Sequence, residues 1–250
     1  MRGIKPFLEH HIWNNKGARA FFIRYEDEDG PHIRLRLRPA EPEHSESLQE
    51  VLEGWFAGTS PSKQVRYNAE AARFGGTEAL SWAEEHFHIS TRVALERLAR
   101  PAYLYGDALF DGVRMQLAAM QTAGLDRQET ISYCARLMEI MLPVFFHFPD
   151  HIPDTDLRNV IKEDFERALA PQQEQVRAEL DNFLQALEEE KFDSQQPEWL
   201  RWIRGNKLIF NGLGDNLEKA LPNLLHFHHN RMGIRNQDEV YIHYILAHTL

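Results

Sequence analysis

The chain has 250 residues, of which 43% are hydrophobic and 26% charged, and these proportions are ordinary for a soluble globular protein. Its formal net charge of −10 argues against a general nucleic-acid binder, because no overall positive field would attract a phosphate backbone. A local basic cleft remains compatible with this charge. We therefore expect no direct partner among nucleic acids.

The cysteine content and the hydropathy favour a cytoplasmic protein. Cys134 is the only cysteine, which excludes a disulfide framework and a cysteine-based zinc site. The first residues, MRGIKPFLEHH, lack the apolar segment of a signal peptide. The most apolar run, Ile140–Phe148, is too short to cross a bilayer, so no membrane contact is expected.

The N-terminal part of the chain predicts a small antiparallel sheet. Residues 6–18 predict a first strand or extended lead-in, and Phe21–Arg38 (FFIRYEDEDGPHIRLRLR) predicts a hairpin that turns at Asp27–Gly30. In the return strand the apolar residues alternate with Arg34, Arg36 and Arg38, which therefore share one face. Guanidinium groups this close repel one another unless anions or carboxylates lie between them. The face is either an anion-binding platform or a solvated edge strand protected by charge.

The stretch after the hairpin predicts a helix within residues 41–57, a turn over residues 58–63 and a short strand over residues 64–69. In the following YNAEAARFGG, Glu70 and Arg73 are three residues apart and would lie on one face if the stretch is helical. The two glycines permit a turn there. Thr77 is placed to cap a helix that continues to Leu98.

From Pro101 onward the apolar spacing predicts helices almost to the C-terminus, with Pro143 kinking or ending the second. We expect these helices near residues 106–123, 127–148, 155–168, 172–191, 197–204, 206–228 and 236–248, with breaks that include residues 149–153 and 193–197. The predicted fold class is α+β, with a small antiparallel sheet packed against a larger helical bundle. We expect a single domain over residues 1–250, mainly β with a connecting helix up to residue 76 and mainly helical from residue 77.

The thirteen histidines form local clusters but no ligand motif such as HExxH, so no metal ion is expected. The last cluster lies in LLHFHHNRMGI, which crowds histidine, asparagine and arginine into the predicted end of a helix. Helix capping and the helix dipole explain such residues as well as a binding site does.

Three separated motifs together resemble one family. FIRYEDEDGPHIRLRLR resembles the FIRY…GPHLRLR pattern that opens the C-terminal domain of class I lantibiotic dehydratases, a domain that also occurs alone as thiopeptide-type bacteriocin biosynthesis proteins. YNAEAARFGG is similar to the motif YxxExxRYGG of this family, with Phe74 in place of tyrosine. LLHFHHNRMGI is similar to HMHxNRLxG, with Phe227 for methionine, Met232 for leucine and no residue between Met232 and Gly233. The helical middle of the chain carries few recognisable residues.

This resemblance implies the glutamate-elimination half of a split dehydratase. In the full-length enzymes one domain transfers glutamate from glutamyl-tRNA to Ser or Thr of a precursor peptide. The second domain, which this chain resembles, eliminates the glutamate to give dehydroalanine or dehydrobutyrine. The implied partners are a precursor peptide, with a leader and a Ser/Thr-rich core, and a separate tRNA-dependent glutamylating subunit. The chemistry needs no cofactor. Whether the chain forms a homodimer is left open by the resemblance.

The motif positions imply the site residues. Arg34 and Arg36 would hold the glutamyl carboxylate and accept the charge of the leaving group, and Glu70 and Arg73 would complete the site. A histidine, either His226 or His228, would act as base or acid, and His229 falls at the variable position of the motif. The candidates for substrate binding are Arg24, Asn230 and Arg231. Arg24 could equally lie at the surface, and the last two could simply tie the helix to the sheet.

Two other functions stay open. A pyridine synthase of the same family would join two dehydroalanines by a formal (4+2) cycloaddition and expel the leader peptide. The presence of both hairpin arginines with Glu70 and Arg73 favours elimination, because cyclisation removes no glutamate. The chain could also be a non-catalytic subunit that binds the precursor or the partner, through helix 172–191 or the hairpin edge.

Overall fold

The computed structural model describes residues 3–58, 62–148, 154–189, 191–192 and 196–250. The chain divides into two compact units. The first comprises Met1–Tyr103 and Asn211–Arg231, and the second comprises Leu104–Phe210 and Met232–Leu250. All residues that the sequence nominates for the site belong to the first unit.

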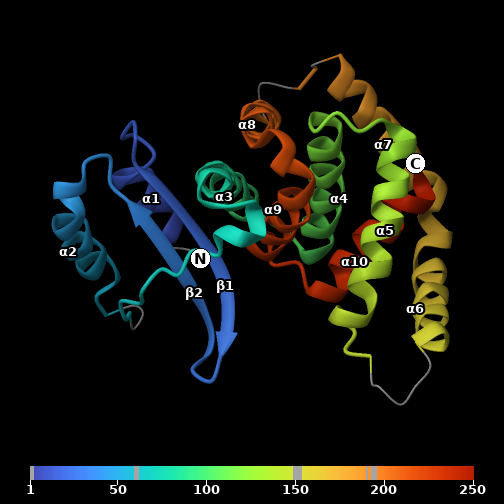
Figure 1. The fold of residues 1–250 in the computed structure, drawn as a ribbon, viewed down its shortest axis with the longest axis horizontal. Coiled ribbons are helices and arrows are strands. Elements are labelled where there is room, and N and C mark those ends of the chain that lie inside the picture. The colour runs from blue at the N-terminus through green and yellow to red at the C-terminus, as the bar shows by residue number, and fades with distance from the viewer. Residues whose placement is uncertain (1–2, 59–61, 149–153, 190, 193–195) are drawn as a thin grey trace. The chain divides into compact units, whose positions relative to one another are not determined.

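The first unit is built on a two-stranded hairpin (Figure 1). Its elements are α1 (Ile4–His11), β1 (Arg19–Asp27), β2 (Gly30–Arg38), α2 (Ser45–Phe56), a short 3-10 helix (Ala71–Phe74), α3 (Thr77–Leu98) and most of α9 (Leu217–Met232). A second 3-10 turn, Pro42–His44, precedes α2.

The hairpin confirms the predicted antiparallel pairing, which runs from Arg19 opposite Arg38 to Asp27 opposite Gly30. Residues directly opposite each other point to the same face. Phe22 and Leu35 therefore share the face that packs on α1 and α2, where they join a core containing Phe7 and Leu8. The other face carries Arg34, Arg36 and Arg38.

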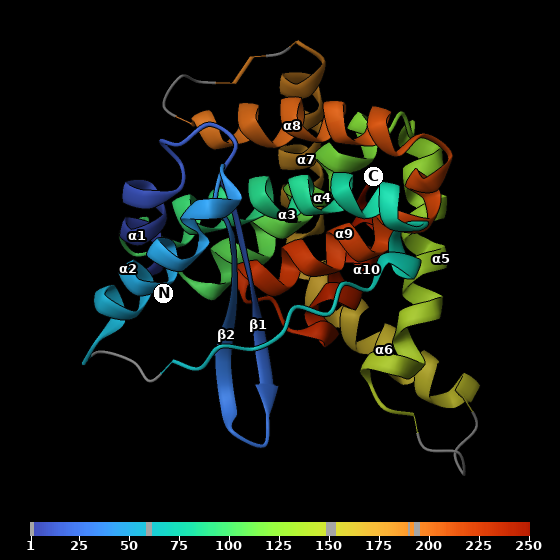
Figure 2. The same ribbon diagram turned by 60° about the vertical axis from the view of Figure 1, so that its left-hand side comes forward.

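The predictions of further strands were wrong. Residues 6–18 do not form a strand, because Ile4, Phe7, Leu8 and Ile12 recur at helical spacing and bury one face of α1 and the turn after it. Residues 64–69 run extended without joining the sheet, which has two strands within the described part of the chain. Figure 2 shows this segment crossing the hairpin on its way to α3.

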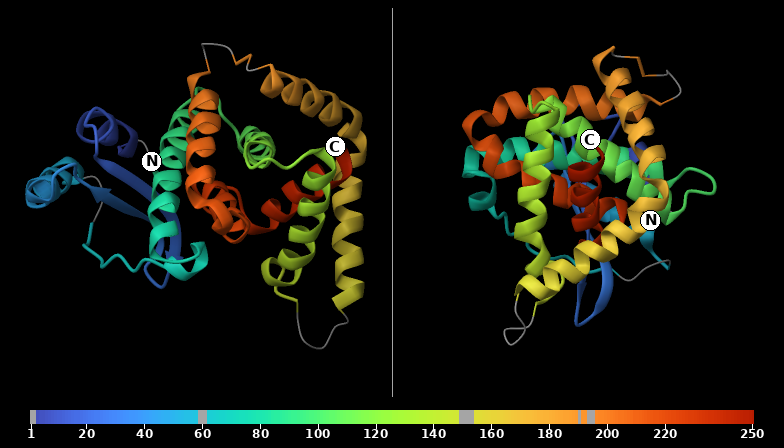
Figure 3. Two further views of the ribbon diagram at one scale, coloured as in Figure 1. Left: turned by 45° about the horizontal axis from the view of Figure 1, so that its top comes forward. Right: turned by 90° about the vertical axis from the view of Figure 1, so that its right-hand side faces the viewer.

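The second unit is helical throughout its described residues (Figure 3). It contains α4 (Tyr105–Thr122), α5 (Arg127–Phe145), α6 (Asp154–Leu169), a 3-10 turn (Ala170–Gln172), α7 (Gln173–Glu188), most of α8 (Pro197–Leu213) and α10 (Asn236–Thr249). α10 packs along α5, and α6 contacts both. Buried Trp202 anchors α8 to α4 by donating from Nε1 to the Met115 carbonyl at 2.9 Å.

Several predicted helix boundaries need correction. The break expected near residue 205 lies instead at the 3-10 turn Gly214–Asn216, because Gly205 is tolerated inside α8 and Gly214 adopts a φ of +51°. Pro143 does not end α5 at once, since it sits in the last turn. Thr77 is the first residue of α3, with Gly76 at the cap position and no side-chain cap bond. Residues 59–61, 149–153 and 193–195, which include parts of three predicted breaks, lie outside the described residues.

The predicted fold class is confirmed: a small antiparallel sheet near the N-terminus packs against helices. None of the described helices has the length and hydropathy to cross a bilayer.

Candidate active site

The arginines of the hairpin differ in what balances their charge. Arg34 reaches Asp27 at the hairpin turn, with 3.2 Å between Nη2 and Oδ2, and its guanidinium carbon lies 3.3 Å from the centre of the Tyr25 ring. Its Nε donates to Nε2 of His32 at 3.3 Å. Arg34 is thus held within the hairpin itself.

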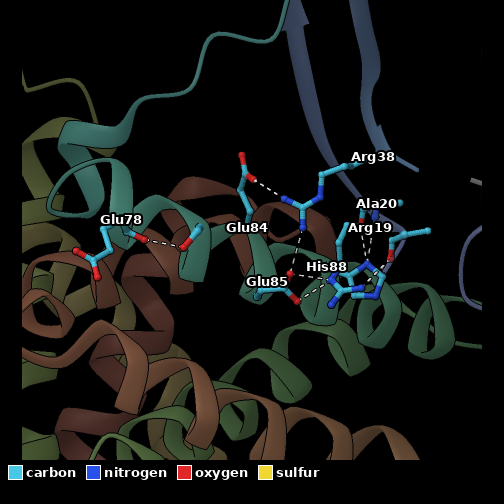
Figure 4. A network of polar contacts seen from close by, with 9 residues as sticks. Arg19, Ala20, Arg38, Glu78, Glu84, Glu85 and His88 are labelled. Atoms are coloured by element: carbon cyan, nitrogen blue, oxygen red, sulfur yellow. Dashed lines mark hydrogen bonds and ion pairs between the residues drawn. The ribbon is translucent and has the colours of Figure 1, made fainter. Parts of the chain in front are cut away.

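Arg38 belongs to a polar network that fixes the base of the hairpin to α3 (Figure 4). Its guanidinium lies 3.7 Å from a Glu84 carboxylate oxygen and 3.3 Å from one of Glu85. Arg19 on the neighbouring strand directs its Nε at both oxygens of Glu85, at 2.8 and 2.7 Å. These carboxylates supply part of the negative charge that the row of guanidiniums requires.

Arg36, between Arg34 and Arg38, has no carboxylate partner among the described residues. It donates weakly to the Leu35 carbonyl at 3.4 Å, and its guanidinium carbon lies 5.4 Å from the centre of the Tyr67 ring. Burial, together with the neighbouring charge of Arg34, lowers the pKa of Arg36. This is the guanidinium best able to accept an anion from outside.

Glu70 and Arg73 form an ion pair at the turn before α3, with Nε 3.0 Å from Oε2. The 3-10 helix Ala71–Phe74 brings them together, and both side chains are half exposed. Gly75 ends this turn at a φ of +105°, where a Cβ atom would meet the Asn216 side chain at 2.1 Å. The turn is also tied to α9, because Asn223 donates to the Arg73 carbonyl at 3.4 Å.

The histidines of α9 occupy two different environments. Asn223 bonds to the Arg73 carbonyl and Asn230 bonds to Arg24 of β1, and His226, three residues after Asn223 and four before Asn230, shares their helix face. His226 is partly exposed. His228 is fully buried and its Nδ1 lies 2.9 Å from the Ser90 hydroxyl of α3. Burial lowers the pKa of His228 well below its usual value, so this ring is neutral.

Asn230 ties α9 to β1. Its side-chain oxygen accepts from the Arg24 amide at 2.8 Å, and its side-chain nitrogen donates to the Arg24 carbonyl at 3.0 Å. The Arg24 side chain donates in turn to the Arg231 carbonyl at 3.3 Å, and burial lowers its pKa. These contacts join the terminal motif to the hairpin as structural bonds.

Arg231 is a fully buried guanidinium behind this junction. Nη1 donates to the Phe227 carbonyl at 2.8 Å and to the Ser90 hydroxyl at 3.4 Å. The guanidinium carbon lies 4.8 Å from the centre of the Phe87 ring. Burial strongly lowers the pKa of Arg231.

Aromatic rings join the three motifs. Phe21 of the hairpin and Phe74 of the turn lie 5.3 and 5.5 Å from the ring of Phe87 on α3, and Phe227 of α9 lies 5.3 Å from the same ring. The structure thus brings residues separated by about 200 positions into one part of the first unit. It does not bring His228 to a surface.

Sequence reasoning missed Tyr67 and Glu84. Tyr67 lies beside Arg36 and Phe21, and its hydroxyl is bonded to the Glu84 carboxylate. Burial and this carboxylate raise the pKa of Tyr67, so the phenol keeps its proton at neutral pH. The signal was available, because Tyr67 opens the motif that supplies Glu70 and Arg73.

Two hollows are lined by residues other than these. One of about 170 Å³ is lined by α1, α2 and the segments next to them, including His11 and His44, and one of about 370 Å³ lies between α6 and α10, including Lys162 and His248. Within the described ranges, no three His, Cys, Asp or Glu side chains are placed to hold a metal ion.

The family model described as "Lantibiotic biosynthesis dehydratase C-term" matches residues 1–250. The chain belongs to this family. Membership places it in lantibiotic biosynthesis, among dehydratase-type enzymes. Comparison with curated proteins finds no match.

Two solved structures share the fold of this family member. The crystal structure of TsrL superposes with a TM-score of 0.63 at 16% identity, covering 98% of this chain and 87% of TsrL. The tRNA-dependent lantibiotic dehydratase MibB from Microbispora sp. 107891 gives a TM-score of 0.54 at 18% identity. That match covers 98% of this chain and 25% of the MibB chain, so the chain spans a quarter of that enzyme.

Proposed function

We propose that this chain eliminates glutamate from glutamylated Ser or Thr side chains of a ribosomally made precursor peptide. Two observations carry the proposal: side chains of all three motifs meet at the Phe87 ring of the first unit, and Arg36, beside Tyr67 of the second motif, is a guanidinium without a carboxylate partner in the described chain. An elimination site needs such a group, because both its substrate and its leaving group carry carboxylates.

The reaction requires three operations. A base removes the Cα proton, the electron pair forms the Cα–Cβ double bond, and the Cβ–O bond breaks to release glutamate through its γ- or α-carboxylate. Arg34 and Arg36 hold the glutamyl group and accept the charge of the departing carboxylate. Arg73, oriented by Glu70 at 3.0 Å, binds the carbonyl oxygen that gains charge when the proton leaves.

His226 is the better candidate for the base. The base must contact a substrate that binds from solution. His226 is partly exposed on α9, whereas His228 is buried against Ser90. The low pKa of His228 makes it a poor proton acceptor. His228 then supports α9 rather than meeting the substrate.

The proposed partners are a precursor peptide and a separate tRNA-dependent glutamylating polypeptide. MibB is named as a tRNA-dependent enzyme, and this chain matches a quarter of its length. The reaction as proposed uses no metal or cofactor. A homodimer and a cytoplasmic location remain compatible with this assignment.

The test is mass spectrometry of a chemically glutamylated Ser-containing peptide incubated with the purified chain. We expect loss of glutamate and formation of dehydroalanine. Arg36→Lys and His226→Gln should each slow the conversion by about 100-fold or more, and His228→Asn by less than about tenfold. Arg92→Lys and His44→Gln, which lie outside the site, serve as matched controls.

Two results would contradict the proposal. An unchanged glutamylated peptide would exclude elimination on this substrate. Loss of the leader from a peptide that already contains two dehydroalanines would make the chain a pyridine synthase. Equal losses in His226→Gln and His44→Gln would remove His226 from the mechanism.

A further inference from the structure

The buried guanidinium of Arg231 lacks a counter-charge. Its side chain has no exposed surface, and only Nη1 has hydrogen-bond partners, which are the neutral Phe227 carbonyl and Ser90 hydroxyl. Within the described residues, no atom accepts from Nε or Nη2. A buried charge without a partner is costly, and proteins normally pair it with a carboxylate. The free N–H groups therefore point to an anion that the chain itself does not supply.

Arg36 is another guanidinium without a carboxylate among the described residues, and it lies in the same neighbourhood. Its guanidinium carbon is 5.4 Å from the centre of the Tyr67 ring. A series of ring contacts connects it to Arg231. The Tyr67 ring lies 5.9 Å from the Phe21 ring, the Phe21 ring lies 5.3 Å from the Phe87 ring, and the Arg231 guanidinium carbon lies 4.8 Å from the centre of the Phe87 ring. The Phe21, Phe87 and Phe227 rings line this neighbourhood and lower its polarity.

We propose that Arg231 and Arg36, with the Tyr67 hydroxyl beside them, form the binding site for the free carboxylate of a dicarboxylic acyl group. This inference rests on the proposed function and deepens it. It assigns recognition of the glutamyl group to a guanidinium behind the hairpin, and it assigns a smaller part to Arg34, which Asp27 already neutralises. A forked guanidinium can give a carboxylate two parallel hydrogen bonds from Nε and Nη2.

Access to Arg231 in this proposal depends on movement of Tyr67. Arg231 is fully buried, so a ligand reaches it only when a covering side chain moves. Tyr67 is 40% exposed and belongs to the extended segment before Glu70, which no strand ladder restrains. Glu84 and the stack on Arg36 hold it in place. A carboxylate that pairs with Arg36 competes with this stack and opens the path to Arg231.

Stability distinguishes a binding arginine from a structural one. Replacing a buried, unpaired charge by an apolar side chain of similar length is often neutral or stabilising. We therefore expect Arg231→Met to unfold thermally at the same temperature as the wild type or higher. A marked fall in that temperature would show that Arg231 serves the fold through Ser90 and the Phe227 carbonyl.

The direct test is calorimetric titration of the full chain with glutarate at constant ionic strength, with L-glutamine as the singly charged comparison. The wild type should bind glutarate more tightly than L-glutamine. Arg231→Met and Arg36→Met should each raise the dissociation constant of glutarate by about tenfold or more, the value expected for a lost charge-assisted pair. Arg92→Met, whose arginine pairs with Glu96 on α3, should bind glutarate as the wild type does.

Equal glutarate affinity in Arg231→Met, Arg36→Met and Arg92→Met would overturn the inference. The elimination assay run in parallel separates its failure from that of the proposed function. If the chain eliminates glutamate, is not inhibited by glutarate and keeps its KM in Arg231→Met, the carboxylate site is overturned and the proposed elimination activity is upheld. Arg231-dependent glutarate binding by a chain that eliminates nothing would uphold the site and contradict the proposed function.

Discussion

The guanidinium groups around the hairpin differ in whether a carboxylate balances their charge. Arg19 and Arg38 are paired with carboxylates of α3, and Arg34 is paired within the hairpin. Arg24, Arg36 and Arg231 have no carboxylate among the residues described, and Arg24 donates to the Arg231 carbonyl. Charge balance therefore leaves three of these six guanidiniums, of which we propose Arg36 and Arg231 as anion acceptors, although its burial would have ranked Arg231 last.

His88 makes the stability of the first unit depend on pH. Burial, reinforced by the nearby charge of Arg19, lowers its pKa from 6.5 to about 4. The unfolded chain then binds a proton more readily than the folded one at pH values between these two. Neutral His88 therefore contributes about 3 kcal/mol to the free energy of unfolding. This contribution is complete above pH 6.5 and is lost as the pH falls towards 4.

Urea unfolding of the wild type and His88→Asn across this pH range measures the effect. Asparagine retains an acceptor near the position of Nδ1, which lies 3.1 Å from the Ala20 amide. The free energy of unfolding should fall more steeply with acid in the wild type than in the variant. His228, whose pKa is also lowered by burial, adds to the slope in both proteins. Parallel curves would exclude His88 as the source.

At the scale of elements, the outer edge of β1 is covered by side chains in place of a third strand. The Ala20, Phe22 and Arg24 amides donate to His88 and Thr91 of α3 and to Asn230 of α9. Successive donors two residues apart face the same edge of a strand. Two helices thus fix the position of the hairpin through its backbone, which explains why the terminal motif carries an asparagine.

Asn230→Ala should uncouple α9 from β1. The Arg24 amide and carbonyl would both lose their partner, at a cost of about 1–3 kcal/mol in unfolding free energy. Hydrogen exchange should accelerate at Arg24 and change little at Phe22. Thr91→Val is the matched variant, which should accelerate Phe22 and spare Arg24. Equal acceleration at both amides in both variants would show that the edge opens as one unit.

The sequence predicted the hairpin and the positions of most helices, because alternation and helical spacing are local patterns. It did not separate α1 from a strand, since a short apolar run fits both periods. The candidate site was nominated by motifs, and the structure adds their partners. Tyr67 and Glu84 could not have been linked from the sequence, because their contact depends on how an unpaired segment crosses the hairpin.

At the scale of the whole molecule, the first unit is discontinuous. Residues up to Tyr103 supply the hairpin and α3, and Asn211–Arg231 return to complete it. α9 meets α3 where His86 bonds to the Leu224 carbonyl at 3.2 Å and Ser90 bonds to His228 at 2.9 Å. The hairpin arginines and the terminal motif therefore depend on one another for their placement.

A chain that ends at Phe210 should fail to form the first unit. It retains the hairpin and α3 but lacks the α9 side chains that bond to both. We expect amide protection at Ala20, Phe22 and Arg24 to be lost in hydrogen exchange, with the full-length chain as the reference. Retained protection with cooperative unfolding would show that the hairpin and α3 are self-sufficient.

Because the first unit is discontinuous in sequence, its two segments are synthesised at different times. Translation at about 5–20 residues per second separates the appearance of Arg36 and His226 by about 10–40 s. During this interval the nascent hairpin has emerged, while the asparagine that covers the end of β1 has not been synthesised. An uncovered strand edge invites pairing with other chains, and a row of arginines on the strand opposes such pairing. The hairpin arginines that we propose to bind the substrate would thus also protect the nascent chain from aggregation.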